Sequence, residues 1–217
     1  MWRRTITFLL SLLSMVMAEA TNHYFKHLGV SDGLSQVCIP SIYQDELGAV
    51  WLGTTEGLNR YNGKDVKVFQ PSESNHGLTN NEINELCGDK NGRMYIRSGN
   101  DLIELDIYTE QFTCLRQKGV YGLFCKKDTL WVSCADGIYY YTGQGTELTF
   151  FARVQKGFVG RALYVDKETV WVVTRKYLVA ISREDPLRQE ILLTLDKGNC
   201  ILGDSSGNIW VGAWNGF

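Results

Sequence analysis

The chain has 217 residues, of which 44% are hydrophobic and 21% are charged, and this is the composition of an ordinary globular protein. Its formal net charge is −2, so there is no electrostatic case for binding nucleic acid or an acidic surface. The 22 glycines indicate a fold with many turns.

The first 20 residues have the three parts of an export signal. Arg3 and Arg4 supply a positive region, residues 6–17 are an apolar run, and Ala18-Glu19-Ala20 is a small-x-small cleavage site. A spanning helix needs about 20 apolar residues, so the run is short for a membrane anchor, although an uncleaved anchor stays open as the alternative. We expect cleavage after Ala20 and a mature domain at 21–217.

Residues 24–28 alternate apolar and polar side chains and predict a short strand ahead of the main pattern. Residues 33–36, with the sequence GLSQ, predict a turn that leads into a strand near 41–44.

The stretch at 44–63 predicts strand, turn, strand, turn and strand. Residues 45–48 have turn chemistry, because aspartate caps its own backbone and glycine accepts a positive φ. Residues 50–52 are apolar and suit a buried strand. Asn62-Gly63 is a strong hairpin signal after the strand at 58–61.

This pattern recurs along the chain. Five aromatic residues, which we take as structural anchors, lie 44, 36, 40 and 39 residues apart: Trp51, Tyr95, Trp131, Trp171 and Trp210. A polar turn precedes each anchor, at 45–48, 89–92, 126–128, 166–168 and 204–207. A small residue follows three positions later: Thr54, Ser98, Cys134, Thr174 and Ala213. An apolar residue follows seven positions later: Leu58, Leu102, Ile138, Leu178 and Phe217.

A period of about 40 residues built from short strands predicts an all-β fold, a β-propeller of four-stranded blades. The blade repeats are expected near 35–70, 79–116, 119–152, 158–194 and 198–217. The polar stretches 71–78, 143–146 and 182–189 are expected as connections, and none is long enough for a domain linker. A β-sandwich with coincidental tryptophan spacing is the alternative.

Six cysteines could form disulfides in an exported chain. None forms a CxxC pair and no histidine stands at a metal-ligand spacing, so we expect no metal site. Most of the cysteines take small or apolar positions of the repeat, as Cys134 does. We therefore favour buried thiols over disulfides, without assigning any pairing.

The sequences GLSQ and IYQDELGAVWLGTTEGLNRYNG resemble the propeller repeat of the two-component regulator family. The resemblance is close at 33–69 and again at 203–217, and it is weaker in the copies between. It implies the periplasmic sensor region of a Bacteroides-type hybrid histidine kinase, which detects glycan fragments. It also implies an oligosaccharide ligand, a homodimer partner and a kinase in the full-length protein.

Four blades and about half of a fifth are expected, whereas propellers of this family usually have about seven. We therefore interpret the chain as an N-terminal part of an incomplete ring, anchored in the inner membrane when full-length. In a complete ring the strand at 24–28 would close the last blade, and a five-bladed ring is the alternative. The face of the fifth repeat would leave Trp210, Val211 and Trp214 partly exposed.

No GxSxG, HExxH, P-loop or GxGxxG motif is present, so we expect neither catalytic residues nor a cofactor. Propellers bind ligands where loops of successive blades converge, so the turns between second and third strands are the candidate ligand sites. The side chains that we expect to bind there are Glu56, Asn100, Asp136, Arg175 and Trp214.

The sequence is compatible with three candidate functions. The first is the glycan-sensing propeller of a two-component protein. The second is an extracellular carbohydrate-binding or scaffold propeller without a kinase. The third and most distant is a lyase or glycosidase built on a propeller.

Overall fold

The computed structural model describes residues 25–71 and 77–214, and it has the predicted all-β architecture. Four antiparallel four-stranded sheets follow one another along the chain, and a two-stranded sheet comes last. The predicted signal peptide at 1–20 lies outside the described residues, as does Phe217 of the apolar column.

The four complete sheets, here called blades 1 to 4, each contain four consecutive strands. Blade 1 has β1 (Ser41–Gln44), β2 (Val50–Thr54), β3 (Gly57–Tyr61) and β4 (Val66–Phe69). Blade 2 has β5 (Ile83–Gly88), β6 (Arg93–Ser98), β7 (Asp101–Asp106) and β8 (Gln111–Arg116). Blade 3 has β9 (Val120–Lys126), β10 (Thr129–Cys134), β11 (Gly137–Tyr141) and β12 (Thr149–Ala152). Blade 4 has β13 (Gly160–Val165), β14 (Thr169–Thr174), β15 (Tyr177–Ser182) and β16 (Gln189–Thr194).

The final hairpin contains β17 (Cys200–Gly203) and β18 (Ile209–Gly212), and two short 3-10 helices, η1 (Val30–Asp32) and η2 (Gln155–Gly157), lie in connections. No helix in the described part of the chain is long and apolar enough to cross a bilayer.

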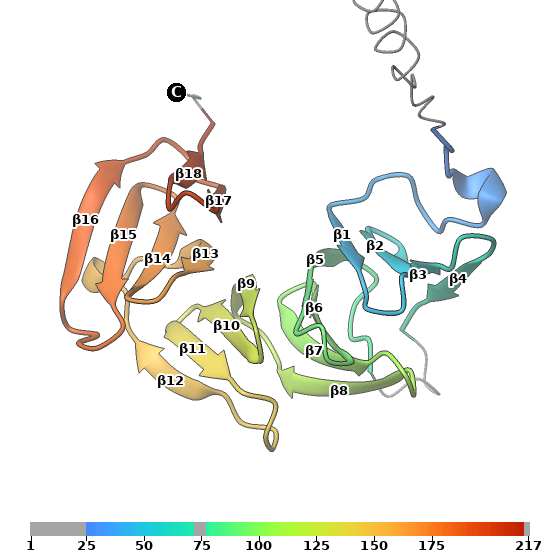
Figure 1. Cartoon of the computed structure of the whole chain (residues 1–217), viewed down its shortest axis with the longest axis horizontal. Coiled ribbons are helices and arrows are strands. Elements are labelled where there is room, and N and C mark those ends of the chain that lie inside the picture. The colour runs from blue at the N-terminus through green and yellow to red at the C-terminus, as the bar shows by residue number, and fades with distance from the viewer. Residues whose placement is uncertain (1–24, 72–76, 215–217) are drawn as a thin grey trace, which may run out of the picture.

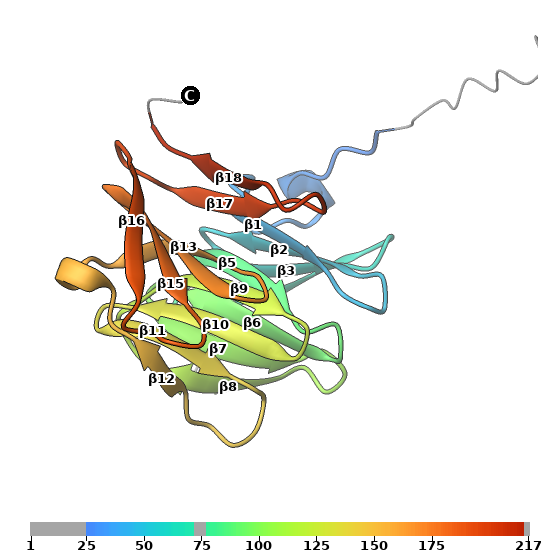
Figure 2. The same cartoon turned by 60° about the vertical axis from the view of Figure 1, so that its left-hand side comes forward.

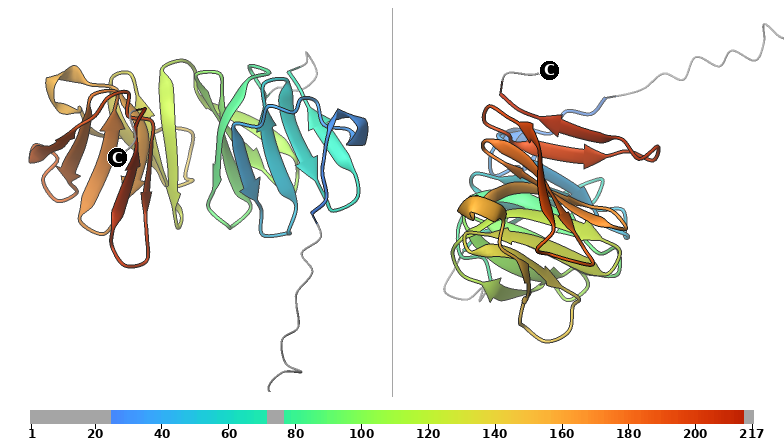
Figure 3. Two further views of the ribbon diagram at one scale, coloured as in Figure 1. Left: turned by 90° about the horizontal axis from the view of Figure 1, so that it is seen from above. Right: turned by 90° about the vertical axis from the view of Figure 1, so that its left-hand side faces the viewer.

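The sheets stand around an open arc, with the first strand of each sheet on the inside and the fourth on the outside (Figure 1). The inner strands β1, β5, β9, β13 and β17 contact one another in that order. Figure 2 shows the final hairpin at one edge of the arc, and Figure 3 shows that the strands run between two faces on which the turns gather. The fold is therefore an incomplete β-propeller.

In three of the five sheets, a hydrogen bond joins the polar turn to the aromatic anchor. In blade 1, the Asp45 carboxylate accepts the backbone N–H groups of Leu47 and Ala49, as expected for a capped turn. Its second oxygen also accepts the indole N–H of Trp51 at 2.7 Å. Each of the five anchors lies in the second strand of its sheet.

The apolar side chains pack between successive sheets. One cluster joins blades 1 and 2 through Trp51 and Ile96, and a second joins blades 2 and 3 through Tyr95 and Val132. A third cluster joins blades 3 and 4, and a smaller one seats the final hairpin on blade 4. Each sheet therefore depends on its neighbour for its core, as in other repeat folds.

Two expectations from the sequence are wrong. Residues 25–28, the described part of the expected strand at 24–28, form no strand, because alternation alone cannot supply a partner edge for pairing. The interpretation of the cysteines as buried thiols holds for Cys134, but Cys38 and Cys200 are exposed.

Candidate functional site

One face of the arc carries the turns between second and third strands together with the connections that enter the next sheet. Backbone hydrogen bonds tie these segments together: the N–H of Gly57 donates to Asn81, that of Gly99 to Glu82, and that of Ala135 to Gly119. Buried side-chain hydroxyls form hydrogen bonds with the backbone of these turns. The Thr54 hydroxyl donates to the Gly57 carbonyl at 2.8 Å. On this face, backbone hydrogen bonds therefore join each of these turns to a neighbouring connection.

Three of the predicted ligand-binding residues, Glu56, Asn100 and Asp136, do not share a single hollow. Glu56 is exposed in the β2–β3 turn, where its carbonyl accepts the Gln70 side chain. Asn100 lines the hollow inside the arc, and its carbonyl accepts the N–H of Val120.

The carboxylate of Asp136 already has partners within the protein. Its carboxylate pairs with Arg116 at 2.7 Å and accepts the Tyr139 hydroxyl at 2.8 Å. Partial burial by itself would raise the pKa of Asp136, but these two hydrogen bonds outweigh it and keep the pKa below its ordinary value. A ligand would have to compete with these partners.

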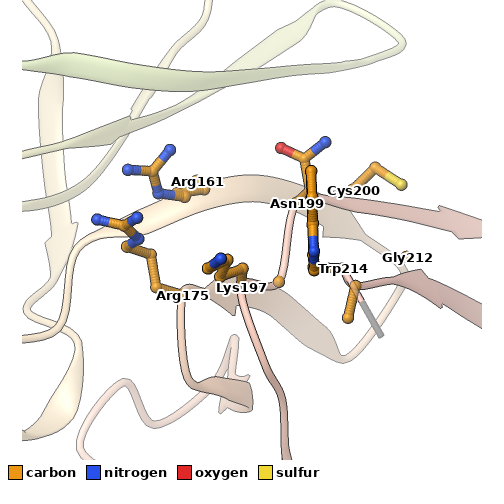
Figure 4. Close-up of a pocket in the computed structure, with 9 residues that line it drawn as sticks. Arg161, Arg175, Lys197, Asn199, Cys200, Gly212 and Trp214 are labelled. Atoms are coloured by element: carbon orange, nitrogen blue, oxygen red, sulfur yellow. The ribbon is translucent and has the colours of Figure 1, made fainter. Parts of the chain in front are cut away.

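The other two predicted residues, Arg175 and Trp214, come together in one hollow of about 320 Å³, which we call the mouth hollow. It also contains Arg161 of β13, Lys197 and Asn199 of the β16–β17 connection. In Figure 4 both guanidinium groups lie at one end of the hollow, and Trp214 stands at the other with Lys197 between them. The Lys197 ammonium lies 5.1 Å from the centroid of the Trp214 ring.

Backbone hydrogen bonds join the three segments that form the mouth hollow. The N–H of Gly198 donates to the carbonyl of Arg175 at 3.1 Å, and the N–H of Trp214 donates to that of Asp196 at 3.0 Å. The Thr174 hydroxyl accepts the N–H of Lys176, which fixes the turn that carries Arg175. The hollow is thus held in place by main-chain contacts.

Sequence reasoning missed Arg161, Lys197 and Asn199. A signal for Lys197 was present, because a Lys-Gly pair occurs in three connections to a following sheet, at 118–119, 156–157 and 197–198. All three lysines have a positive φ, between 51° and 63°. Such a conformation in a residue other than glycine costs on the order of 1 kcal/mol, and often marks a functional segment.

A larger hollow of about 840 Å³, which we call the inner hollow, is lined by side chains of all five inner strands. It shares Arg161, Asn199 and Cys200 with the mouth hollow, so the two hollows adjoin. Glu85 faces the inner hollow, where it accepts the N–H of Leu123 at 3.1 Å and contacts Arg97 at 3.4 Å. Desolvation raises the pKa of Glu85 to about 7, against the opposing effect of Arg97.

Within the described residues, no group of three histidine, cysteine, aspartate or glutamate side chains is arranged to hold a metal ion. The chemistry available at the mouth hollow is hydrogen bonding, cationic attraction and contact with an exposed indole.

Two short segments of the chain match known sequences. Residues 33–56 match the family model described as the two component regulator propeller. A stretch of 53 residues is 40% identical to histidine kinase P4 of Formosa agariphila and covers 24% of this chain. The chain spans 4% of that kinase.

Solved structures share the fold. The extracellular domain of a hybrid two component system from B. thetaiotaomicron superposes with a TM-score of 0.75 at 23% identity, over 87% of this chain and 29% of that one. The extracellular domain of a one component system from the same organism gives 0.67 at 19% identity, over 81% of this chain and 28% of that one. The chain thus spans less than a third of either relative. The segment that matches the two component regulator propeller model, residues 33–56, includes β1 and β2 of blade 1 in an incomplete β-propeller.

Proposed function

We propose that the chain is the periplasmic ligand-sensing propeller of a hybrid two-component signalling protein, and that its ligands are glycan fragments. The observation that carries this proposal is the family match at 33–56, in the blade where the repeat is most regular. The similarity to a histidine kinase over 53 residues supports a kinase in the complete protein.

The mouth hollow is the proposed ligand site. An exposed tryptophan beside fixed polar groups is suited to a sugar, because the indole covers the apolar face of the ring while the polar groups bind hydroxyls. The remaining predicted residues, Glu56, Asn100 and Asp136, are proposed as contacts of larger oligosaccharides along the same face. The role is binding without catalysis.

Signalling requires that the ligand bind one of two arrangements of the protein more tightly than the other. We propose that the two arrangements are those of a homodimer in the membrane, with the propellers outside and the kinases inside.

A thermal-shift screen of the full chain against oligosaccharides tests the proposal. A ligand at 100 times its Kd stabilises the folded state by about 2.7 kcal/mol, which corresponds to a rise in Tm of about 5–10 °C. An Arg175→Ala, Trp214→Ala variant should lose the shift, whereas Glu56→Ala should retain most of it. A complete absence of shifts over neutral, acidic and sulfated glycans would contradict a glycan sensor, and release of new reducing ends would indicate an enzyme.

A further inference from the structure

The mouth hollow has a strong local charge that differs from that of the whole chain. Arg161, Arg175 and Lys197 line it, and none of its lining residues is acidic. An adjoining hollow shares both arginines, adds Lys176 and again has no acidic lining residue. The formal net charge of the whole chain is −2, whereas the side chains that line this hollow are positively charged or neutral.

Within residues 25–71 and 77–214, no ion pair neutralises these cations. The ion pairs between described residues involve other arginines and lysines, and none includes Arg161, Arg175 or Lys197. The Lys197 ammonium lies against the ring of Trp214. Like charges held close together repel one another, and an anion that binds between them relieves this repulsion.

The backbone of the segments that carry the cations is held in place. Lys197 has a φ of 51°, and the hydrogen bonds of Gly198 to Arg175 and of Trp214 to Asp196 hold its loop between the other two segments. The main chain that carries these side chains therefore needs no rearrangement when a ligand binds.

We propose that the mouth hollow binds an anionic sugar, one that carries a carboxylate or a sulfate group. Arg161 and Arg175 pair with the anionic group, since guanidinium groups donate two parallel hydrogen bonds to such oxygens. Lys197 adds a third positive charge, and the Trp214 indole covers the apolar part of the sugar. This inference rests on the proposed function and narrows its ligand class.

Calorimetric titration of the full chain with three probes tests the inference: a galacturonate oligosaccharide, a sulfated galactose oligosaccharide and a neutral galactose oligosaccharide of the same length. We expect one of the anionic probes to bind at least tenfold more tightly than the neutral one, with an affinity that falls as salt is added. The two anionic probes distinguish a carboxylate ligand from a sulfate ligand.

Arg161→Gln and Arg175→Gln should each weaken the binding of the anionic probe by about 10- to 100-fold. Arg188→Gln is the matched control, because Arg188 is an exposed arginine in the β15–β16 connection, and it should leave the affinity unchanged. Unchanged circular dichroism and Tm of each variant would exclude misfolding. Equal binding of neutral and anionic probes would overturn the inference while leaving glycan sensing intact, and no binding of any probe would contradict both.

A different observation carries a second inference. Cys87 of β5 and Cys125 of β9 lie on neighbouring inner strands, and their sulfur atoms are 2.7 Å apart. Both line the inner hollow. We infer that the two thiols form a disulfide between blades 2 and 3 when the protein is exposed to a disulfide oxidant.

The reaction is a thiol–disulfide exchange with a small or protein disulfide as oxidant. One cysteine thiolate attacks the S–S bond of the oxidant, which forms a mixed disulfide and releases half of the oxidant as a thiol. The thiolate of the other cysteine then attacks the cysteine sulfur of the mixed disulfide, which forms the protein disulfide and releases the second half of the oxidant as a thiol. Burial raises the pKa of the Cys87 thiol, so the exchange should be slow at neutral pH.

Peptide mass spectrometry after incubation of the full chain with oxidised glutathione tests this inference. The expected result is a crosslinked pair of peptides that contain Cys87 and Cys125, and a Tm that is about 5–10 °C higher than that of the reduced protein. Cys125→Ser should abolish both effects, and Cys114→Ser should abolish neither. Free alkylation of both cysteines after oxidation, or a crosslink to another cysteine, would overturn it.

Discussion

At the residue scale, three aspartates hold both a turn and the aromatic ring that follows it. Asp45, Asp166 and Asp204 each accept backbone N–H groups of their own turn. Their second oxygens accept the indole N–H of Trp51, Trp171 and Trp210. In these three sheets, the turn and the anchor therefore form one hydrogen-bonded unit.

Burial decides how much this unit contributes to stability. Asp45→Ala would leave the indole N–H of Trp51, which is 0% exposed, and two backbone donors without a partner, which should lower the free energy of unfolding by about 2–4 kcal/mol. Asp204→Ala removes the same bonds from Trp210, which is 62% exposed and can use water, so its loss should be much smaller. Urea denaturation of both variants measures the difference, and equal losses would contradict this account.

Glu85 should make stability depend on pH. Its pKa rises from 4.5 to about 7 because its charged form is desolvated, so the folded state holds the proton more tightly than the unfolded chain does. The stability that this proton provides is therefore lost as the pH rises from about 4.5 to 7. Glu85→Gln removes this titration, so the free energy of unfolding of the variant minus that of the wild type should increase between pH 5 and pH 8. A difference that stays constant with pH would show that Glu85 does not titrate in this range.

At the element scale, close approach of inner strands requires small residues. An added Cβ at Gly122 of β9 would lie 2.6 Å from the carbonyl oxygen of Arg161 in β13, and the obstacle is backbone that cannot rotate away. Arg161 is also a lining residue of the mouth hollow, so this contact between the two strands lies next to the proposed ligand site.

Gly122→Ala should therefore separate blades 3 and 4 and lower the free energy of unfolding by about 1–3 kcal/mol. It should also weaken ligand binding at the mouth hollow, because Arg161 moves with its strand. Gly29→Ala is the control, since its neighbours lie at an ordinary 3.8 Å and its φ of −131° suits any residue. A thermal melt that is the same for both variants would mean that the blades adjust without cost.

Some of these elements could be predicted from the sequence and others could not. The strands at 50–54 and 57–61 follow from turn chemistry and apolar columns, because both are local signals that the chain repeats. The strand expected at 24–28 has the right alternation, but strand formation needs an edge to pair with, which no local pattern reveals. The mouth hollow was only half predicted, since Arg161 and Lys197 reach Arg175 through contacts between different sheets.

At the scale of the whole molecule, the arc is open between the final hairpin and β1 (Figure 1). Ile42 of β1 is 63% exposed on one side of this opening, and Leu202 of the hairpin is 64% exposed on the other. Trp210 and Trp214 are also exposed and Val211 is half-buried, as the sequence predicts. Exposed large apolar side chains on the edge sheets favour association with other apolar surfaces.

The full chain should consequently bind a hydrophobic dye and tend to self-associate. A Leu202→Ser, Trp210→Ser variant should reduce both the dye fluorescence and the fraction of oligomers in size-exclusion chromatography, because it removes two large apolar side chains from the hairpin. Leu187→Ser is the control: Leu187 is more exposed than either, but it stands alone in the β15–β16 connection, where it forms no patch. If Leu187→Ser reduced dye binding as strongly as the double variant, the dye would be reporting scattered surface leucines, and the open edge of the arc would not be the association surface.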